Sequence, residues 1–375
     1  LPKDNPVAEK LGDITTSCSI FAKNDSVNLD INFEGINEST PSNKGRINIG
    51  SYLSIFQNKP RLDIAVKQTQ IILNDSSWTI NPTTITYTHS NKTTQINNFR
   101  LGTDYQSLQA DGRISKSKKD SVNINLHNLN VDYLLSFTEA SKAITVQGPV
   151  TGNATLYNVL SNVMLEANAQ IKNAGLNGVY LGDVTATAKL DKPNKSIIVE
   201  GEAKDSTNHR VAVIDGTIIP SEKKWVLNVD CDSVDLRIID FWTKQILSNP
   251  QGRGYGKIQI KGIKRDVTVT GLPSVKNAQI TLPQIGATFS FDGTIDLQEN
   301  FIRFNKIILY DQYKNEGIFD GALYHKNFMN FHYEFTALAN NMHVMDLPAN
   351  PQSLFYGQVF ATGDVHIKGN EETCK

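Results

Sequence analysis

Most of this chain alternates between apolar and polar residues, with a period of two. Such alternation is typical of a β-strand that turns one face toward an apolar environment and the other toward water. The pattern predicts an all-β protein, an elongated array of antiparallel strands that repeats and curls into a trough-like groove (a β-taco), with short helical turns. The clearest alternating segments are residues 122–127, 185–189, 227–232, 257–261, 266–270, 289–292 and 364–368.

Asp-Gly and Asn-Gly pairs predict where the strands turn, because both pairs tolerate positive φ and are typical of hairpin turns. Lysine-bearing segments at 117–119, 222–224 and 325–327 predict further turns and favour an antiparallel meander. The predicted Asp-Gly and Asn-Gly turns are Asp111-Gly112, Asn177-Gly178, Asp215-Gly216, Asp292-Gly293 and Asp320-Gly321.

A Gly-rich strand entry recurs at an almost constant interval of about 104 residues, which indicates a repeat array. It occurs at 45–50, 148–152, 252–256 and 357–363. We therefore expect one continuous elongated domain, and an internal segment of a longer protein. The expected divisions are a partial repeat at 1–44, β repeats at 45–147, 148–251 and 252–356, and the start of a further repeat at 357–375.

Helical patterns are few. Apolar residues in 234–247 lie at helical spacing, and the equivalent segments 131–137 and 342–348 predict a short helix or helical turn at the end of each repeat. Such an element covers the sheet or lines a groove.

Charge and cysteine content exclude several function classes. With 37 basic and 38 acidic residues, the net charge of −1 predicts neither nucleic-acid binding nor a polybasic membrane patch acting by long-range attraction. The three cysteines are far apart and predict neither a disulfide framework nor a zinc site. No apolar run reaches the ~18–20 residues needed to span a bilayer.

No motif for covalent catalysis, phosphate binding or dinucleotide binding is present, so no catalytic residue, metal or cofactor is assigned. Three acidic residues, Asp230, Asp232 and Asp235, allow a calcium hypothesis, but alternation also places Asp230 and Asp232 on an outward strand face. His127 and His366 occupy polar-face positions and are expected to be solvated.

A long apolar sheet face must be covered by a second sheet, by helices or by a ligand. The few helical segments are too short to cover it, so the sheet either folds onto itself or holds apolar molecules. In a groove, acyl chains would lie on the apolar residues; in a folded sheet, the same residues would form an ordinary core. These candidate lipid-groove residues are Val122, Ile124, Leu126, Leu227, Val229, Ile258, Ile260, Val267, Val269, Phe289, Phe291, Val365 and Ile367.

Residues 354–369, 254–262 and 146–156 resemble the Tyr-Gly, Gly, strand pattern of TamB/AsmA-like proteins. The resemblance implies a β-taco groove that carries phospholipid between the inner and outer membranes of Gram-negative bacteria. It further implies a periplasmic segment, an inner-membrane anchor outside this chain, and an Omp85-type outer-membrane assembly partner engaged through other regions. A role in outer-membrane protein assembly is also implied.

Two other function classes fit parts of the pattern. A tandem array of β-sandwich domains, as in an adhesin or a carbohydrate-binding protein, suits the interval of about 104 residues. A β-helical polysaccharide lyase or hydrolase is also rich in strands, but its rungs repeat every ~20–25 residues, which this chain does not. Stable ~100-residue proteolytic fragments would favour the sandwich array.

Overall fold

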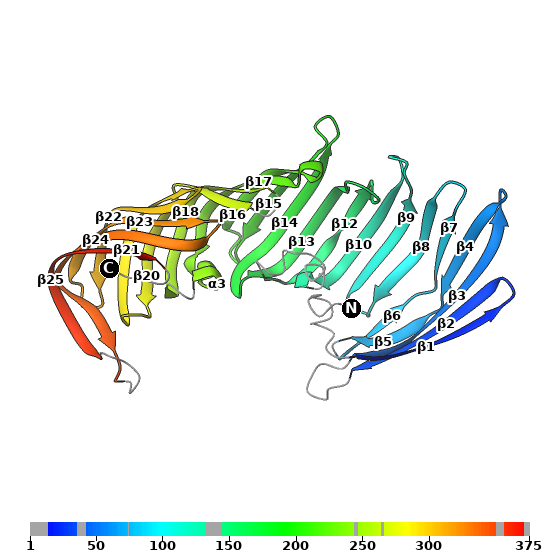
Figure 1. Cartoon of the computed structure of the whole chain (residues 1–375), viewed down its shortest axis with the longest axis horizontal. Coiled ribbons are helices and arrows are strands. Elements are labelled where there is room, and N and C mark those ends of the chain that lie inside the picture. The colour runs from blue at the N-terminus through cyan, green and yellow to red at the C-terminus, as the bar shows by residue number, and fades with distance from the viewer. Residues whose placement is uncertain are drawn as a thin grey trace. The chain divides into compact units, whose positions relative to one another are not determined.

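The computed structural model describes residues 14–35, 43–73, 75–132, 145–243, 247–263, 266–349 and 356–370. Nearly all of them lie in strands of one 25-stranded antiparallel sheet (Figure 1). The expectation of an all-β, antiparallel fold is confirmed.

The first part of the chain follows the strand order of a meander. Its strands are β1 (Ile14–Lys23), β2 (Ser26–Gly35), β3 (Lys44–Phe56), β4 (Lys59–Val66), β5 (Thr69–Leu73), β6 (Ser76–Ile80), β7 (Thr83–Thr88), β8 (Thr93–Gly102), β9 (Ser107–Ile114), β10 (Ser121–Asn130), β11 (Val146–Gln147), β12 (Pro149–Tyr157), β13 (Met164–Leu176), β14 (Val179–Asp191) and β15 (Ser196–Lys204).

The remaining part continues in the same way, with a short helical segment between β17 and β18. Its elements are β16 (Arg210–Ile219), η2 (Pro220–Glu222), β17 (Lys224–Asp235), η3 (Leu236–Ile239), α3 (Asp240–Thr243), β18 (Ser248–Ile263), β19 (Asp266–Gly271), β20 (Ser274–Leu282), β21 (Ala287–Gln298), β22 (Phe301–Asp311), β23 (Glu316–Lys326), β24 (Met329–Leu347) and β25 (Gly357–Asn370).

Contacts divide the chain into two compact units. Unit 1 comprises 1–174 and 184–198, and unit 2 comprises 175–183 and 199–375. The division passes through the expected repeat 148–251.

Some strands are interrupted, so that two short strands together pair with one long neighbour. In unit 1, β4 and β5 both pair with β3. In unit 2, β19 and β20 both pair with β18, and the break between them contains Pro273. Proline has no backbone N–H to donate to a ladder, so the strand bends there.

Four of the five predicted Asp-Gly and Asn-Gly turns are not turns. Asp111-Gly112, Asp215-Gly216, Asp292-Gly293 and Asp320-Gly321 all lie inside strands. Asn177-Gly178 does join β13 to β14, with φ of 52° and 81°, as a hairpin turn with two positive φ values requires. The three lysine-bearing segments lie at hairpin connections, as expected.

Three of these Asp-Gly pairs, together with two Thr-Gly pairs, belong to a different recurring feature, which we call the bulge clamp. One residue with φ between 46° and 54° bulges from a strand, and its backbone N–H donates to an Asp or Thr side chain on the next strand, 2.6 to 3.0 Å away. The five described pairs are Asn98 with Asp111, Asn128 with Thr151, Asn277 with Asp292, Lys306 with Asp320, and Asn341 with Thr362.

Each acceptor of the bulge clamp is followed by glycine, and the close approach of the following strand explains why in several cases. A Cβ on Gly112 would lie 2.3 Å from the carbonyl oxygen of Ser121, and one on Gly152 would lie 2.2 Å from that of Asn168. A Cβ on Gly321 would lie 2.3 Å from the carbonyl oxygen of Glu334. A side chain at these positions would push the neighbouring strand away.

The predicted helical segments have three outcomes. Residues 236–243 form the 3-10 helix η3 and the single helical turn α3, with the Asp235 side chain accepting from the Arg237 N–H at 3.0 Å. Within 131–137, Val131 and Asp132 are helical and the rest lies outside the described residues. The prediction for 342–348 is wrong, because residues 342–347 belong to β24.

The apolar side chains gather on one face of the sheet in each unit. In unit 1 a cluster of buried residues comprises Ile71, Trp78, Leu129, Val131 and Val150. In unit 2 a smaller cluster comprises Ala287, Phe289 and Met342.

Candidate functional site

The apolar face of unit 1 carries a continuous row of mostly aliphatic side chains that crosses ten strands. Strand register brings these residues side by side, although they are spread over more than 140 positions of the sequence. Most are half-buried, while Val122 is buried and Ala22 is exposed. The row consists of Ala22, Val27, Ser51, Ile64, Ile85, Ile96, Gly112, Val122, Leu156 and Leu165.

A hollow of about 590 Å³ lies over β10, β12, β13 and β14. Its wall includes Leu126 together with the small residues Gly152, Ala169 and Ala186. The register pairs Leu126 with Gly152 and Gly152 with Ala169, so small side chains leave space beside a large one. Asn125, Asn153 and Asn168 also line the hollow.

Unit 2 has a corresponding apolar row across its own strands. It runs from β16 to β24 and contains glycine at one position. Its members are Ile214, Val229, Ile258, Gly271, Leu297, Ile302, Leu323 and Tyr333.

An aromatic cluster extends this face toward β25. The ring centroids of Phe304 and Phe319 are 5.4 Å apart, and those of Phe319 and Phe335 are 4.9 Å apart. Phe335 also stacks on Tyr333 at 5.7 Å. All four rings are half-buried, so part of each ring faces solvent.

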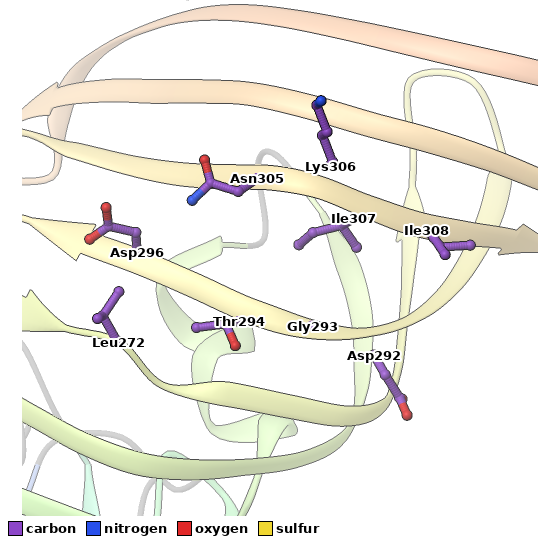
Figure 2. Close-up of a pocket in the computed structure, with 9 residues that line it drawn as sticks. All are labelled: Leu272, Asp292, Gly293, Thr294, Asp296, Asn305, Lys306, Ile307 and Ile308. Carbon is purple, nitrogen blue, oxygen red and sulfur yellow. The ribbon is translucent and has the colours of Figure 1, made fainter.

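A second hollow, of about 360 Å³, lies where the ladder between β21 and β22 is interrupted (Figure 2). Here Ile307 reaches over Gly293, and a Cβ on that glycine would lie 3.2 Å from the Ile307 Cδ1 atom. The carboxylates at its wall already accept hydrogen bonds: Asp292 from the Asn277 N–H at 2.6 Å, and Asp296 from the Gln298 amide at 2.7 Å.

The strand register places all thirteen candidate lipid-groove residues on the apolar face of their own unit. Val122, Ile124 and Leu126 lie in unit 1 and the others in unit 2. Cross-strand pairs join Leu227 to Ile260 and Ile260 to Val269. Val122 and Phe289 are buried, Val365 is 48% exposed, and the other members are half-buried. These last are Ile124, Leu126, Leu227, Val229, Ile258, Ile260, Val267, Val269, Phe291 and Ile367.

Sequence reasoning missed part of the same surface. Ile64, Ile85 and Ile96 in unit 1 and the aromatic cluster in unit 2 were not among the candidates. Their apolar alternation is visible in the sequence, but the cross-strand register that unites them is not.

Two ion pairs join neighbouring strands. Arg46 pairs with Asp30 on the polar face, and Arg210 pairs with Asp232. Hydrogen bonding to Arg210 lowers the pKa of Asp232, and hydrogen bonding to Asp232 in turn raises the pKa of Arg210. His127 and His366 are exposed, as expected.

The calcium hypothesis does not fit the surroundings of its acidic residues. Asp232 pairs with Arg210, and Asp235 lies 2.7 Å from an Arg237 guanidinium nitrogen. Burial opposes the charge of Asp235, but hydrogen bonds from Arg237 outweigh it and lower the pKa. Across the described part of the chain, no three His, Cys, Asp or Glu side chains converge to hold a metal ion.

Comparison with protein families, with curated proteins and with solved structures finds no match for this chain. Among the helices that the structure describes, none is long and apolar enough to cross a membrane. Any functional assignment must therefore be argued from the surfaces themselves.

Proposed function

We propose that the apolar face of this sheet binds phospholipid acyl chains as part of a periplasmic bridge that carries phospholipid between the inner and outer membranes. The observation that supports this most strongly is the pair of continuous apolar rows, whose residues are mostly half-buried. In a closed sandwich, residues at the centre of such rows would be covered by a second layer and excluded from solvent.

The dimensions of the unit 1 row suit an extended apolar ligand. Ten neighbouring strands at a spacing of ~4.8 Å give a row about 40 Å long. The hydrocarbon core of a bilayer is ~30 Å thick, so one leaflet contributes chains of about 15 Å. The row can hold more than one acyl chain end to end, and each CH₂ removed from water contributes ~0.8 kcal/mol.

The arrangement of the acidic side chains fits a lipid conduit better than an enzyme. Asp30 and Asp232 form ion pairs with arginines, and Asp292 accepts a hydrogen bond from a backbone N–H. Acyl chains need no such groups, because apolar contact is non-directional and permits movement along the row. An inner-membrane anchor and an Omp85-type partner, both engaged outside this chain, belong to the same proposal.

The phospholipid content of the purified chain tests this proposal. We expect native mass spectrometry with lipid extraction to recover more than one phospholipid per chain, and a globular control protein expressed in the same way to carry none. A monomer that is folded and free of lipid would contradict the proposal and favour a sandwich array.

A further inference from the structure

The near-zero net charge of the chain conceals a separation of charge within unit 1. Successive antiparallel strands turn at alternate edges of a sheet, so every second hairpin turn lies on the same edge. The turns that join β1 to β2, β3 to β4, β7 to β8, β9 to β10, β12 to β13 and β14 to β15 share one edge, which we call the lysine edge (Figure 1). Its turns and the strand ends beside them carry the exposed residues Lys23, Lys59, Lys92, Lys116, Lys118, Lys119, Lys192 and Lys195.

Three aspartates accompany these lysines, and two of them are engaged in holding their turns. Asp120 accepts from the Ser115 hydroxyl at 2.5 Å and lies 3.6 Å from Arg113. Asp191 accepts from the Asn194 side-chain amide at 2.7 Å. The lysines of this edge therefore outnumber its acidic groups.

The opposite edge of unit 1 has the reverse charge. The described residues of its connections include Asp75, Asp104 and Asp132 and contain no lysine or arginine, and the strand ends beside these connections carry one exposed lysine, Lys44. The net charge of the chain predicts no polybasic patch. This edge nevertheless carries several lysines, because folding brings together residues that are far apart in the sequence.

Large apolar side chains are exposed beside the same lysines. Ile20 and Phe21 are each 65% exposed next to the β1–β2 turn, and Ile55 is 72% exposed next to the β3–β4 turn. Leu160 in the β12–β13 turn is 62% exposed. Phe56 lies beneath the Arg61 guanidinium, whose carbon is 6.0 Å from the ring centroid.

We propose that the lysine edge of unit 1 docks on the surface of an anionic phospholipid bilayer. Cations beside exposed aliphatic and aromatic tips are the combination that binds such interfaces, since the cations meet lipid phosphates and the tips enter the headgroup region. A polyanion such as nucleic acid would contact the lysines, but the exposed side chains of Ile55 and Leu160 would add nothing to its binding free energy. The inference goes beyond acyl-chain binding and stands without it.

Sedimentation with sucrose-loaded vesicles tests the proposal on the full chain. We expect binding to phosphatidylcholine vesicles that contain 30% phosphatidylglycerol, little binding to phosphatidylcholine alone, and weaker binding as salt rises. The triple variant Lys116→Gln, Lys118→Gln, Lys119→Gln should lower the partition coefficient on the order of tenfold to a hundredfold.

A matched variant separates position from net charge. Lys44→Gln, Lys67→Gln, Lys172→Gln removes the same charge from exposed lysines of unit 1 that lie outside the lysine-edge turns, and it should bind vesicles within about twofold of the parent. Ile55→Ser with Phe56→Ser keeps every charge and should also weaken binding about tenfold, because the apolar tips are lost.

Three results would overturn the proposal: equal losses in both lysine triples, equal binding to neutral vesicles, or retention of single-stranded DNA without vesicle binding. The phospholipid content of the Lys116→Gln, Lys118→Gln, Lys119→Gln variant should equal that of the parent. Failure of edge docking is therefore distinguishable from failure of the acyl-binding proposal.

Discussion

Replacement of Val269 by aspartate should remove most of the phospholipid bound to unit 2 while the sheet stays folded. Val269 is half-buried on the apolar face and lies opposite Ile260. A bound acyl chain would cover the new carboxylate and deprive it of water, which is costly for an unpaired charge. We expect at least about a tenfold loss of affinity, measured as phospholipid per chain by native mass spectrometry.

Thr268→Asp is the matched control, because it places the same charge on the same strand but on the opposite face. Thr268 lies opposite Lys261, so the carboxylate gains a cation and remains hydrated. This variant should keep its phospholipid. If Val269→Asp instead unfolds unit 2, as monitored by hydrogen exchange of β17–β20, then this face is an ordinary core and the groove account is wrong.

Loss of the Asp311 carboxylate should cause a large loss of stability in unit 2. Asp311 is 2% exposed and accepts four hydrogen bonds. The donors are the N–H groups of Tyr313, Asn315 and His343 and the Asn315 side-chain amide, at 2.7 to 2.9 Å. They connect the β22–β23 turn to a bulge in β24.

Asp311→Ala leaves the buried His343 N–H and the part-buried donors of Tyr313 and Asn315 without their acceptor, and each buried unsatisfied donor costs ~1–3 kcal/mol. We therefore expect a local loss of at least about 3 kcal/mol, measured by hydrogen exchange of residues 311–315 and 339–345. Asp292→Ala removes one bulge-clamp acceptor at an exposed site and should cost about 1 kcal/mol. Equal effects of the two substitutions would contradict this assignment.

The buried Asp311 carboxylate also makes the local stability of unit 2 depend on pH, and the direction of that dependence can be stated. Burial opposes the charge of Asp311, but the N–H donors outweigh it, and its pKa lies below the ordinary value of 3.8. The ionised carboxylate therefore contributes its full stability above pH 3.8, and that contribution is lost as pH falls through the lowered pKa. Exchange of residues 311–315 should accelerate in this acid range in the parent but not in Asp311→Ala, after correction for the intrinsic exchange rate.

The sequence was sufficient to predict which side chains of a strand share a face, because the alternation of apolar and polar residues continues on both sides of a β-bulge. In β10, the clamp residue Asn128 adds one position, so Leu126 pairs with Gly152 and Leu129 with Val150. Both leucines stay on the apolar face, since the bulge inserts a residue without reversing the strand. Strand parity was sufficient to place Val122, Ile124 and Leu126 correctly on one face.

The prediction of turns at the Asp-Gly pairs was wrong because an Asp-Gly pair is compatible both with a hairpin turn and with a strand beside a bulge. Positive φ at glycine is typical of a hairpin turn, and Gly112 and Gly321 do have φ of 146° and 144°. What decides the outcome is the pair of neighbouring strands. The bulge of the preceding strand donates an N–H to Asp111 or Asp320, and the backbone of the following strand approaches the glycine. A sequence does not state which strand will be the neighbour.

The helix predicted at 342–348 fails for a related reason. Two register shifts fall in β24, between Ala339 and Met342 and between His343 and Met345. Each shift breaks the period of two, so the apolar residues acquire a spacing that resembles a helix.

The charge separation of unit 1 could not be predicted from the sequence either, because it depends on which turns share an edge.

The central claim is that acyl chains lie on the apolar face, and photocrosslinking tests it most directly. Phospholipid carrying a diazirine at the acyl terminus would be loaded into the chain and irradiated, and the adducts mapped by mass spectrometry. We predict adducts at apolar-row positions such as Ile96 in unit 1 and Ile258 and Val269 in unit 2. Adducts confined to polar-face residues such as Thr268 and Lys261, or none above a lipid-free background, would contradict the account.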